Sequence, residues 1–354
     1  MPKDTIPPHA PRHLSRDHGL DVARGIAIVA VVAGHIFPDP AKSMIYVFHM
    51  PFFFFVGGHL FRSSPDGPLL LRRFRQLIVP YLVFLLLFSL PNLIAPLREA
   101  QLSEALWRIR QLALGGEKLV SPLTVFWFPT CYFLTVVIYN ALSRRLSPRA
   151  IWVASAGLLT AAYANQLLFP DAWLPWALNV CAMSIPMLHI GVTFGERIFR
   201  PDRQLLWACA VIALATLAAV ALVDLPTMTM KRAAYGVPLL TLLAALACTT
   251  CLAAIGGVVA SRPGLATPAI ACGVASMTIM YLHMPVQLTL LAAGLDSPWG
   301  RFILTVVLCV AAHRVFDAFA PTRVLLLGKP GRAPKVDRPA QADGRRGAAR
   351  PVRS

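Results

Sequence analysis

Long apolar stretches recur along the whole chain, and they constrain its fold more than any other feature. Ten windows are apolar over about the 20 residues that a helix needs to cross a bilayer. Apolar residues make up 57% of the 354 residues and charged residues only 14%, with a mean hydropathy of +0.63. The ten predicted spans are 20–37, 44–61, 77–97, 123–142, 150–169, 173–194, 204–223, 236–260, 268–292 and 300–319. These features exclude a conventional soluble enzyme, a disordered chain and a disulfide-stapled small protein. They predict an all-α integral membrane protein, a polytopic bundle of about ten transmembrane helices.

Basic residues set the predicted orientation, because cytoplasmic loops are enriched in Lys and Arg. With the N-terminus inside, the inner segments hold 23 of the 33 basic residues and the outer segments hold eight. Both termini are therefore predicted to be cytoplasmic. The net charge of +17 lies in loops and in the tail, so no nucleic-acid partner is expected and the bilayer is the expected partner.

Three regions follow from this pattern. Residues 1–19 form a cytoplasmic N-terminal segment, 20–320 a transmembrane domain, and 321–354 a basic cytoplasmic tail whose composition predicts disorder. The stretch 98–122 mixes charges with Leu and Trp, which predicts an amphipathic helix on the membrane surface.

The seven cysteines all fall inside apolar stretches. The one Cys-x-x-Cys pair, Cys248 and Cys251, has only Thr, Ala and Leu around it, whereas a zinc or redox site typically has polar neighbours or a second pair. We interpret these thiols as small packing residues, and we predict no metal site and no structural disulfide.

Ionisable side chains at membrane depth are costly, which makes them candidates for function. Arg24 and His35 are eleven residues apart in the first span, so they share one helix face and lie about 16 Å apart along its axis. His49, near the start of the second span, is predicted at the depth of His35. The plainer interpretations are an interfacial arginine paired with Asp21, and histidines that only pack.

Further candidates lie in a loop and in two later spans. Arg72 and Arg75 are one helical turn apart in an inner basic loop, and such a pair could hold phosphates. Basic inner loops are also ordinary in membrane proteins. Trp127 and Tyr132 open the fourth span as an aromatic belt, and His283 lies within the ninth.

Together these residues resemble the acyltransferase-3 family of membrane acyltransferases, and within it the fucose O-acetylase-like branch. Each motif is weak alone, but their order and spacing over about residues 17–320 are specific. The motifs are Leu20-Asp21-Val-Ala-Arg24-Gly25, Arg24-x10-His35, Phe48-His49-Met50-Pro51 with the following Phe run, Arg72-x-x-Arg75 with Pro80-Tyr81, and Tyr281-Leu282-His283. The family commonly has Ser-Gly-aromatic after the Phe run, where this chain has Gly57-Gly58-His59.

The resemblance implies transfer of an acyl group, usually acetyl from acetyl-CoA, to a hydroxyl of a sugar or glycan precursor. The Arg-x10-His motif of the family falls on Arg24 and His35, which implies that these two residues are catalytic. Its Arg-x-x-Arg motif falls on Arg72 and Arg75, and the resemblance implies that these arginines bind CoA together with Arg24. A histidine suits the base that accepts the hydroxyl proton near neutral pH, and a covalent acyl-histidine is the alternative. We expect His49 to assist or orient. Succinyl or longer acyl groups also remain open.

Several other expectations complete this prediction. Trp127, Tyr132 and His283 are expected to contact the acceptor, acetyl-CoA acts as co-substrate with no permanently bound cofactor, and polysaccharide-synthesis machinery is an expected partner. The expected location is the inner membrane of a bacterium, with several passes. Two different functions stay open. One is a transporter or flippase for a polysaccharide precursor, because buried Arg and His residues with Pro breaks also suit a substrate pathway. The other is a membrane scaffold.

Overall fold

The computed structural model describes residues 17–99 and 101–330, and within them the protein is almost entirely helical. An isolated bridge between Thr229 and Ala234 is the one β-type pairing in these residues. The elements in order are α1 His18–Ile36, α2 Ala41–Tyr46, α3 His49–His59, α4 Asp66–Arg73, η1 Phe74–Ile78, α5 Val79–Arg98, α6 Leu102–Leu114, η2 Gly116–Lys118, α7 Trp127–Arg145, α8 Pro148–Leu168, η3 Pro175–Val180, α9 Cys181–Phe199, α10 Arg203–Val223, η4 Met230–Arg232, α11 Leu240–Ala260, α12 Pro263–Val274, α13 Ser276–Ala292, α14 Pro298–Ala318 and α15 Ala320–Leu325.

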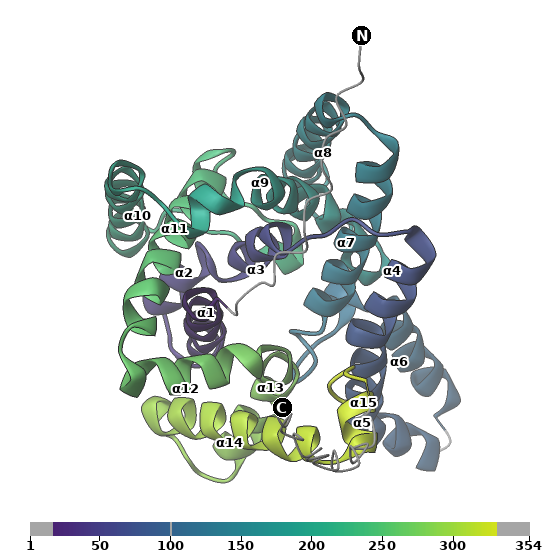
Figure 1. The fold of residues 1–354 in the computed structure, drawn as a ribbon. Helices are drawn as coiled ribbons and strands as arrows, with labels where there is room; N and C mark the ends of the chain where they lie inside the picture. The colour runs from purple at the N-terminus through teal and green to yellow at the C-terminus, as the bar shows by residue number, and fades with distance from the viewer. Residues whose placement is uncertain (1–16, 100, 331–354) are drawn as a thin grey trace, which may run out of the picture.

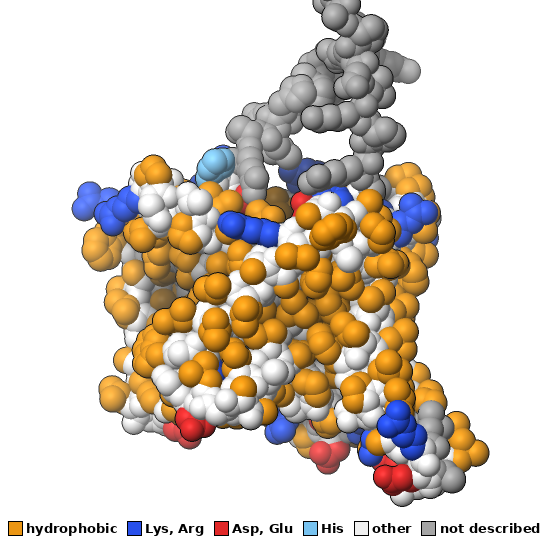
Figure 2. All heavy atoms as spheres, turned by 90° about the horizontal axis from the view of Figure 1, so that it is seen from below, with side chains coloured by type: hydrophobic (Ala, Val, Ile, Leu, Met, Phe, Trp, Pro, Cys, Tyr) orange, Lys and Arg blue, Asp and Glu red, His pale blue; other side chains and the backbone are white. Residues whose placement is uncertain are grey.

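Seven helical segments of the described chain are long and apolar enough to cross a membrane. They are His18–Ile36, Asp66–Pro96, Pro148–Leu168, Pro175–Phe199, Arg203–Val223, Leu240–Ala260 and Pro298–Ala318. An eighth is α12 with α13, if these two helices, bent by 81°, count as one span. Figure 2 shows apolar side chains over the side of the molecule, with charged side chains gathered along its two edges. The all-helical membrane fold is confirmed, but the predicted count of about ten spans is not.

The second predicted span, 44–61, is two short helices instead of one long helix. Pro51 lacks an N–H and therefore fits only the first turn of a helix, so α3 begins just before it, at His49. The 11 residues of α3 rise about 16 Å, roughly half of a bilayer core. The fourth predicted span, 123–142, corresponds to α7, whose 19 residues are not among the seven apolar segments.

Close helix contacts at glycines organise the centre of the bundle. In Figure 1, α1 lies among α3, α11, α12 and α13, and it packs against α11 and α12. A Cβ at Gly25 would overlap the carbonyl oxygen of Ala269 on α12, so the two backbones touch there. A Cβ at Gly58 would likewise overlap the carbonyl oxygen of Leu188, which brings α3 against α9. Gly58 therefore permits the close approach of these two helices.

The two ends of the described chain lie on one face of the bundle. Asp17 caps α1, and its Oδ2 lies 3.1 Å from Nη2 of Arg200. At the other end, the segment 326–330 follows α15 and passes beside the backbone of Arg75. Lys329 of this segment lines the same cavity as Arg24.

The stretch 98–122 contains the predicted amphipathic helix, α6. Its exposed side chains include large apolar ones, and Trp107 and Leu102 are more than half exposed. Its placement on a membrane surface stays a prediction.

Candidate functional site

Two cavities lie toward the two ends of α1. The first, which we call the Arg24 cavity, has a volume of about 390 Å³ and opens beside the segment 326–330. The second, which we call the His35 cavity, has a volume of about 370 Å³. The sequence predicted Arg24 and His35 on one helix face. In the structure Arg24 lines the first cavity and His35 lines the second.

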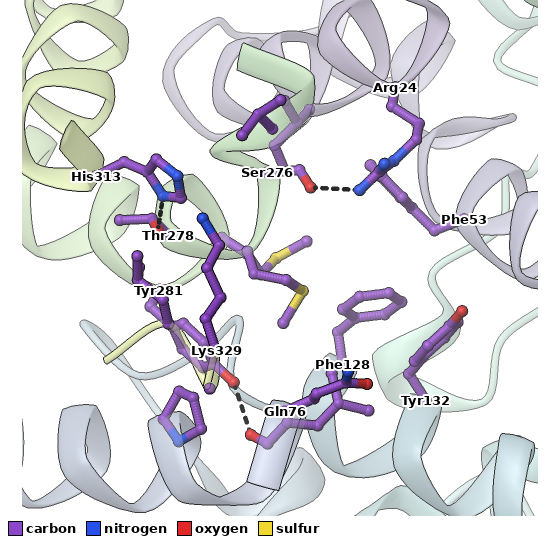
Figure 3. Close-up of a pocket in the computed structure, with 18 of the residues that line it drawn as sticks. Arg24, Phe53, Gln76, Phe128, Tyr132, Ser276, Thr278, Tyr281, His313 and Lys329 are labelled. Carbon is purple, nitrogen blue, oxygen red and sulfur yellow. Dashed lines mark hydrogen bonds between the residues drawn. The ribbon is translucent and has the colours of Figure 1, made fainter. Parts of the chain in front are cut away.

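Arg24 is held at the junction of α1 with the bend between α12 and α13. Its Nη2 lies 3.3 Å from Oγ of Ser276, the first residue of α13 (Figure 3). Its Nη1 lies 3.4 Å from Oδ1 of Asp21. The pairing with Asp21 was foreseen as a plain structural role for Arg24. The guanidinium nevertheless also lines the cavity, so the ion pair orients it there.

The Arg24 cavity is positively charged. Besides Arg24, it is lined by Arg73 and Lys329, and no carboxylate belongs to its described lining. Arg73 donates to Oε1 of Gln76 at 3.3 Å. Lys329 Nζ donates to Oδ1 of Asp317 at 2.8 Å, and Asp317 itself lies outside the lining. His313 adds a ring nitrogen 2.7 Å from Oγ1 of Thr278 (Figure 3).

The predicted pair Arg72 and Arg75 does not line this cavity. Both side chains are exposed, and Arg72 donates to Oγ of Ser64 at 3.3 Å. The intervening Arg73, which the sequence argument passed over, lines the cavity in their place. Residues Phe74–Ile78 form a π-helix, whose wider turn breaks the one-turn spacing assumed for Arg72 and Arg75. A phosphate-binding role for these two stays a prediction.

The His35 cavity contains both histidines that were predicted at one depth. His35 lies in the last turn of α1 and His49 begins α3, and both line the cavity together with Trp127. Tyr132, also predicted to contact the acceptor, lines the Arg24 cavity instead. Each of these predicted roles remains untested.

A third histidine, His283 of α13, lies against His35. The two ring centroids are 5.2 Å apart, and His283 is fully buried. Tyr46 lies near both of the other histidines, with its ring centroid 6.3 Å from that of His35 and 4.7 Å from that of His49. The sequence put these side chains on three separate spans, and the fold brings them together.

The hydrogen bonds of two of these histidines fix their tautomers. Nδ1 of His49 lies 3.0 Å from the Ile45 carbonyl oxygen, and Nδ1 of His283 lies 2.8 Å from that of Ile279. A carbonyl oxygen can only accept, so both Nδ1 atoms carry the proton and both Nε2 atoms present a lone pair. Nε2 of His283 has no hydrogen-bond partner among the described residues. His35 has no hydrogen bond of its ring within the same residues, which leaves it free for a ligand.

One methionine belongs to the walls of both cavities. Met280, only 2% exposed, lines the Arg24 cavity and the His35 cavity alike. On the facing helix, Ile28 lines the first cavity and Val31, less than one turn further on, lines the second. Sequence reasoning missed Met280, although it directly precedes the Tyr281-Leu282-His283 motif. The arrangement is a cationic site and a histidine site that share an apolar wall at Met280.

Such a bundle, with ionisable side chains turned from apolar helices into two cavities, defines a multi-pass membrane protein. The chain belongs to the acyltransferase-3 family, since the sequence model of that family, described as an acyltransferase domain, matches residues 17–313. The protein is therefore a membrane acyltransferase by family.

A curated relative supports this assignment. The chain is 27% identical over 174 residues to nodulation protein NolL of Mesorhizobium japonicum. The match covers 42% of this chain and 42% of NolL, so it spans about two fifths of that relative's length. No solved structure matches the chain significantly.

Proposed function

We propose that the protein is a membrane O-acetyltransferase that moves an acetyl group from acetyl-CoA to a hydroxyl of a sugar or glycan precursor. One observation carries this proposal beyond the family. A cationic cavity and a histidine cavity lie toward opposite ends of α1 and share Met280 in their walls. A donor with a polyanionic head and a thin reactive arm fits such a pair of cavities.

The charged head of CoA would occupy the Arg24 cavity. Arg24, Arg73 and Lys329 supply guanidinium and ammonium groups for its phosphates. Asp21 and Asp317 contact Arg24 and Lys329, but neither carboxylate belongs to the described lining. Arg72 and Arg75, exposed near this rim, remain candidates for the same polyanion. The pantetheine arm would then pass Ile28 and Met280 toward His35, along the axial rise of about 16 Å between Arg24 and His35.

The reaction follows from the free ring nitrogens of His35. His35 accepts the proton of the acceptor hydroxyl as its oxygen attacks the thioester carbonyl. When the tetrahedral intermediate collapses, the carbon–sulfur bond breaks and the proton passes to the departing sulfur, which gives CoA thiol and an acetyl ester. His49, with its Nε2 lone pair, orients the acceptor in the same cavity. Arg24 contributes at the other end by holding the donor.

The proposed setting is the inner membrane of a bacterium, with the Arg24 cavity facing the cytoplasm, where acetyl-CoA is made. Arg24, Lys329 and Asp17 then lie on the cytoplasmic side. The acceptor would enter from the opposite side, supplied by polysaccharide-synthesis machinery. No observation on the fold or the relatives favours the transporter alternative.

The test is thiol release from acetyl-CoA by the full chain in nanodiscs, with a glycan extract of the producing organism as acceptor. His35→Ala should lower turnover by at least about 100-fold, the lower end of a general-base contribution. His59→Ala is the matched control, because His59 lies at the other end of α3 and lines neither cavity. Full turnover in folded His35→Ala would refute the assignment, as would the absence of any acetyl transfer by the wild type.

A further inference from the structure

The His35 cavity carries an excess of positive charge beside its histidines. Lys42, Lys231 and Arg232 all line it, and no Asp or Glu belongs to its described lining. Five hydroxyl side chains add to the polar part of the wall: Ser43, Tyr46, Thr124, Thr227 and Thr229. A neutral sugar needs hydroxyl and amide partners, but it gains little from three cations. The composition of this wall therefore points to a charged ligand.

Lys231 is the most informative of the three cations. It lies in the loop between α10 and α11, where Nζ donates to the carbonyl oxygen of Leu119 at 2.6 Å and to Oγ1 of Thr124 at 2.8 Å. Both partners are neutral, and an ammonium group has a third N–H to donate. Burial lowers the pKa of Lys231 to about 8, with Glu117 opposing the shift from a distance and Arg232 adding to it. A half-buried charge without a contacting carboxylate is costly, and a neutral donor could hold the same loop.

The other two cations differ in how far they are compensated. Lys42 lies 3.7 Å from Oδ2 of Asp39, an exposed carboxylate that also accepts a hydrogen bond from the Ser43 hydroxyl at 2.5 Å. Arg232 is exposed and has no ion-pair partner among the described residues. Lys231 and Arg232 are consecutive and both line the cavity, so two cations without a contacting carboxylate lie together in its wall.

We propose that the acceptor of the acyl group is an anion, and that Lys231 and Arg232 hold its carboxylate or phosphate while the acceptor hydroxyl lies at His35. This inference rests on the proposed function and adds the chemical class of the acceptor. A carboxylate on a uronic acid and a phosphate on a lipid-linked sugar are two sources of the same charge. Either would be bound by charge-assisted hydrogen bonds, which are the strong ones in proteins.

The first experiment separates acceptors by charge. A glycan and lipid-linked sugar extract of the producing organism is divided by anion exchange at neutral pH, and each fraction is offered to the full chain in nanodiscs with radiolabelled acetyl-CoA. We expect acetylated product from the retained fraction. Product from the unretained fraction alone would overturn the inference and leave the acetyltransferase assignment standing. No product from any fraction, with no thiol release, would instead overturn the proposed function.

The source of the charge is then identified by removing it chemically. Carbodiimide activation followed by borohydride reduction converts carboxylates to alcohols, and phosphatase or mild acid removes phosphates. Loss of acceptor activity after one of these treatments supports the inference and names the anion. Acceptor activity that survives both treatments overturns it.

The second experiment asks whether this cavity binds the anion. Arg232→Gln should raise the KM for the retained acceptor about tenfold, the loss expected for one charge-assisted hydrogen bond, with a much smaller change in kcat. Arg232 is exposed, so its replacement leaves the packing intact. Lys231 also anchors the loop at Leu119, which makes it the less suitable probe. Arg110→Gln is the matched control, because Arg110 is an exposed cation on α6 that lines neither cavity. An unchanged KM in Arg232→Gln, or an equal rise in both variants, would overturn the inference.

Discussion

Replacement of Met280 by alanine should thin the apolar wall between the two cavities. The side chain is 2% exposed and contributes to both walls, so the change leaves only its Cβ between the Arg24 cavity and the His35 cavity. A buried Met→Ala change costs about 2–5 kcal/mol of stability. We expect the lower end of that range, because two existing cavities already deprive this side chain of packing partners.

The same variant should change which acyl groups reach His35. Each methylene buried in an apolar site is worth about 0.8 kcal/mol, and a pocket that excludes one discriminates about tenfold or more. Butyryl carries two more methylenes than acetyl. If Met280 limits the space for the acyl group between the two cavities, the preference for acetyl-CoA over butyryl-CoA should fall at least about tenfold in Met280→Ala.

The assay is thiol release from the two thioesters, compared as kcat/KM. Met284→Ala serves as control, because Met284 is buried on the same helix one turn further on and lines neither cavity. An unchanged acetyl-to-butyryl ratio in Met280→Ala, or an equal shift in Met284→Ala, would refute the reasoning that Met280 separates donor and acceptor sites.

Two further predictions concern stability, measured as Tm in detergent. Gly25→Ala should lower the free energy of unfolding by about 1–3 kcal/mol or more, since the new Cβ would overlap the Ala269 carbonyl. Gly157→Ala should leave the stability unchanged or raise it by about 0.5–1 kcal/mol, because a Cβ at Gly157 would have no neighbouring atom within 4 Å. Equal effects of the two changes would contradict the close α1–α12 contact. The Lys231 pKa of about 8 lies below its ordinary 10.5, so the folded state binds fewer protons than the unfolded state between these pH values. The Tm of the wild type should therefore rise relative to Lys231→Met from pH 7.5 to pH 10, and a constant or falling difference would count against a buried ammonium.

The sequence predicted the helices better than their course through the membrane. Hydropathy windows locate apolar stretches, and α1, α8, α10, α11 and α14 follow the predicted spans within a few residues. The same windows do not detect a change of direction. The 81° bend between α12 and α13, and the break between α2 and α3, each fall inside one apolar stretch. Hydropathy therefore does not show where a helix is broken inside an apolar stretch.

The residues of the candidate site likewise include some that the sequence predicted and some that it missed. Arg24 and His35 lie in one regular helix, where spacing alone fixes the relative direction of side chains. Arg73 was missed because the π-helix at Phe74–Ile78 shifts the register beside it. Lys231 was counted only as an outer charge, since its partners Leu119 and Thr124 are more than 100 residues away in sequence.

The fixed tautomers of His49 and His283 have a consequence for the proton in the proposed reaction. Each ring commits its Nδ1 hydrogen to a carbonyl of its own helix, so while neutral it can accept a proton at Nε2 but has none to release there. His35 alone of the three has both nitrogens uncommitted among the described residues. In the proposed reaction His35 takes up the hydroxyl proton on one of these nitrogens and returns it from that nitrogen to the CoA sulfur, so a single ring carries the proton through one turnover.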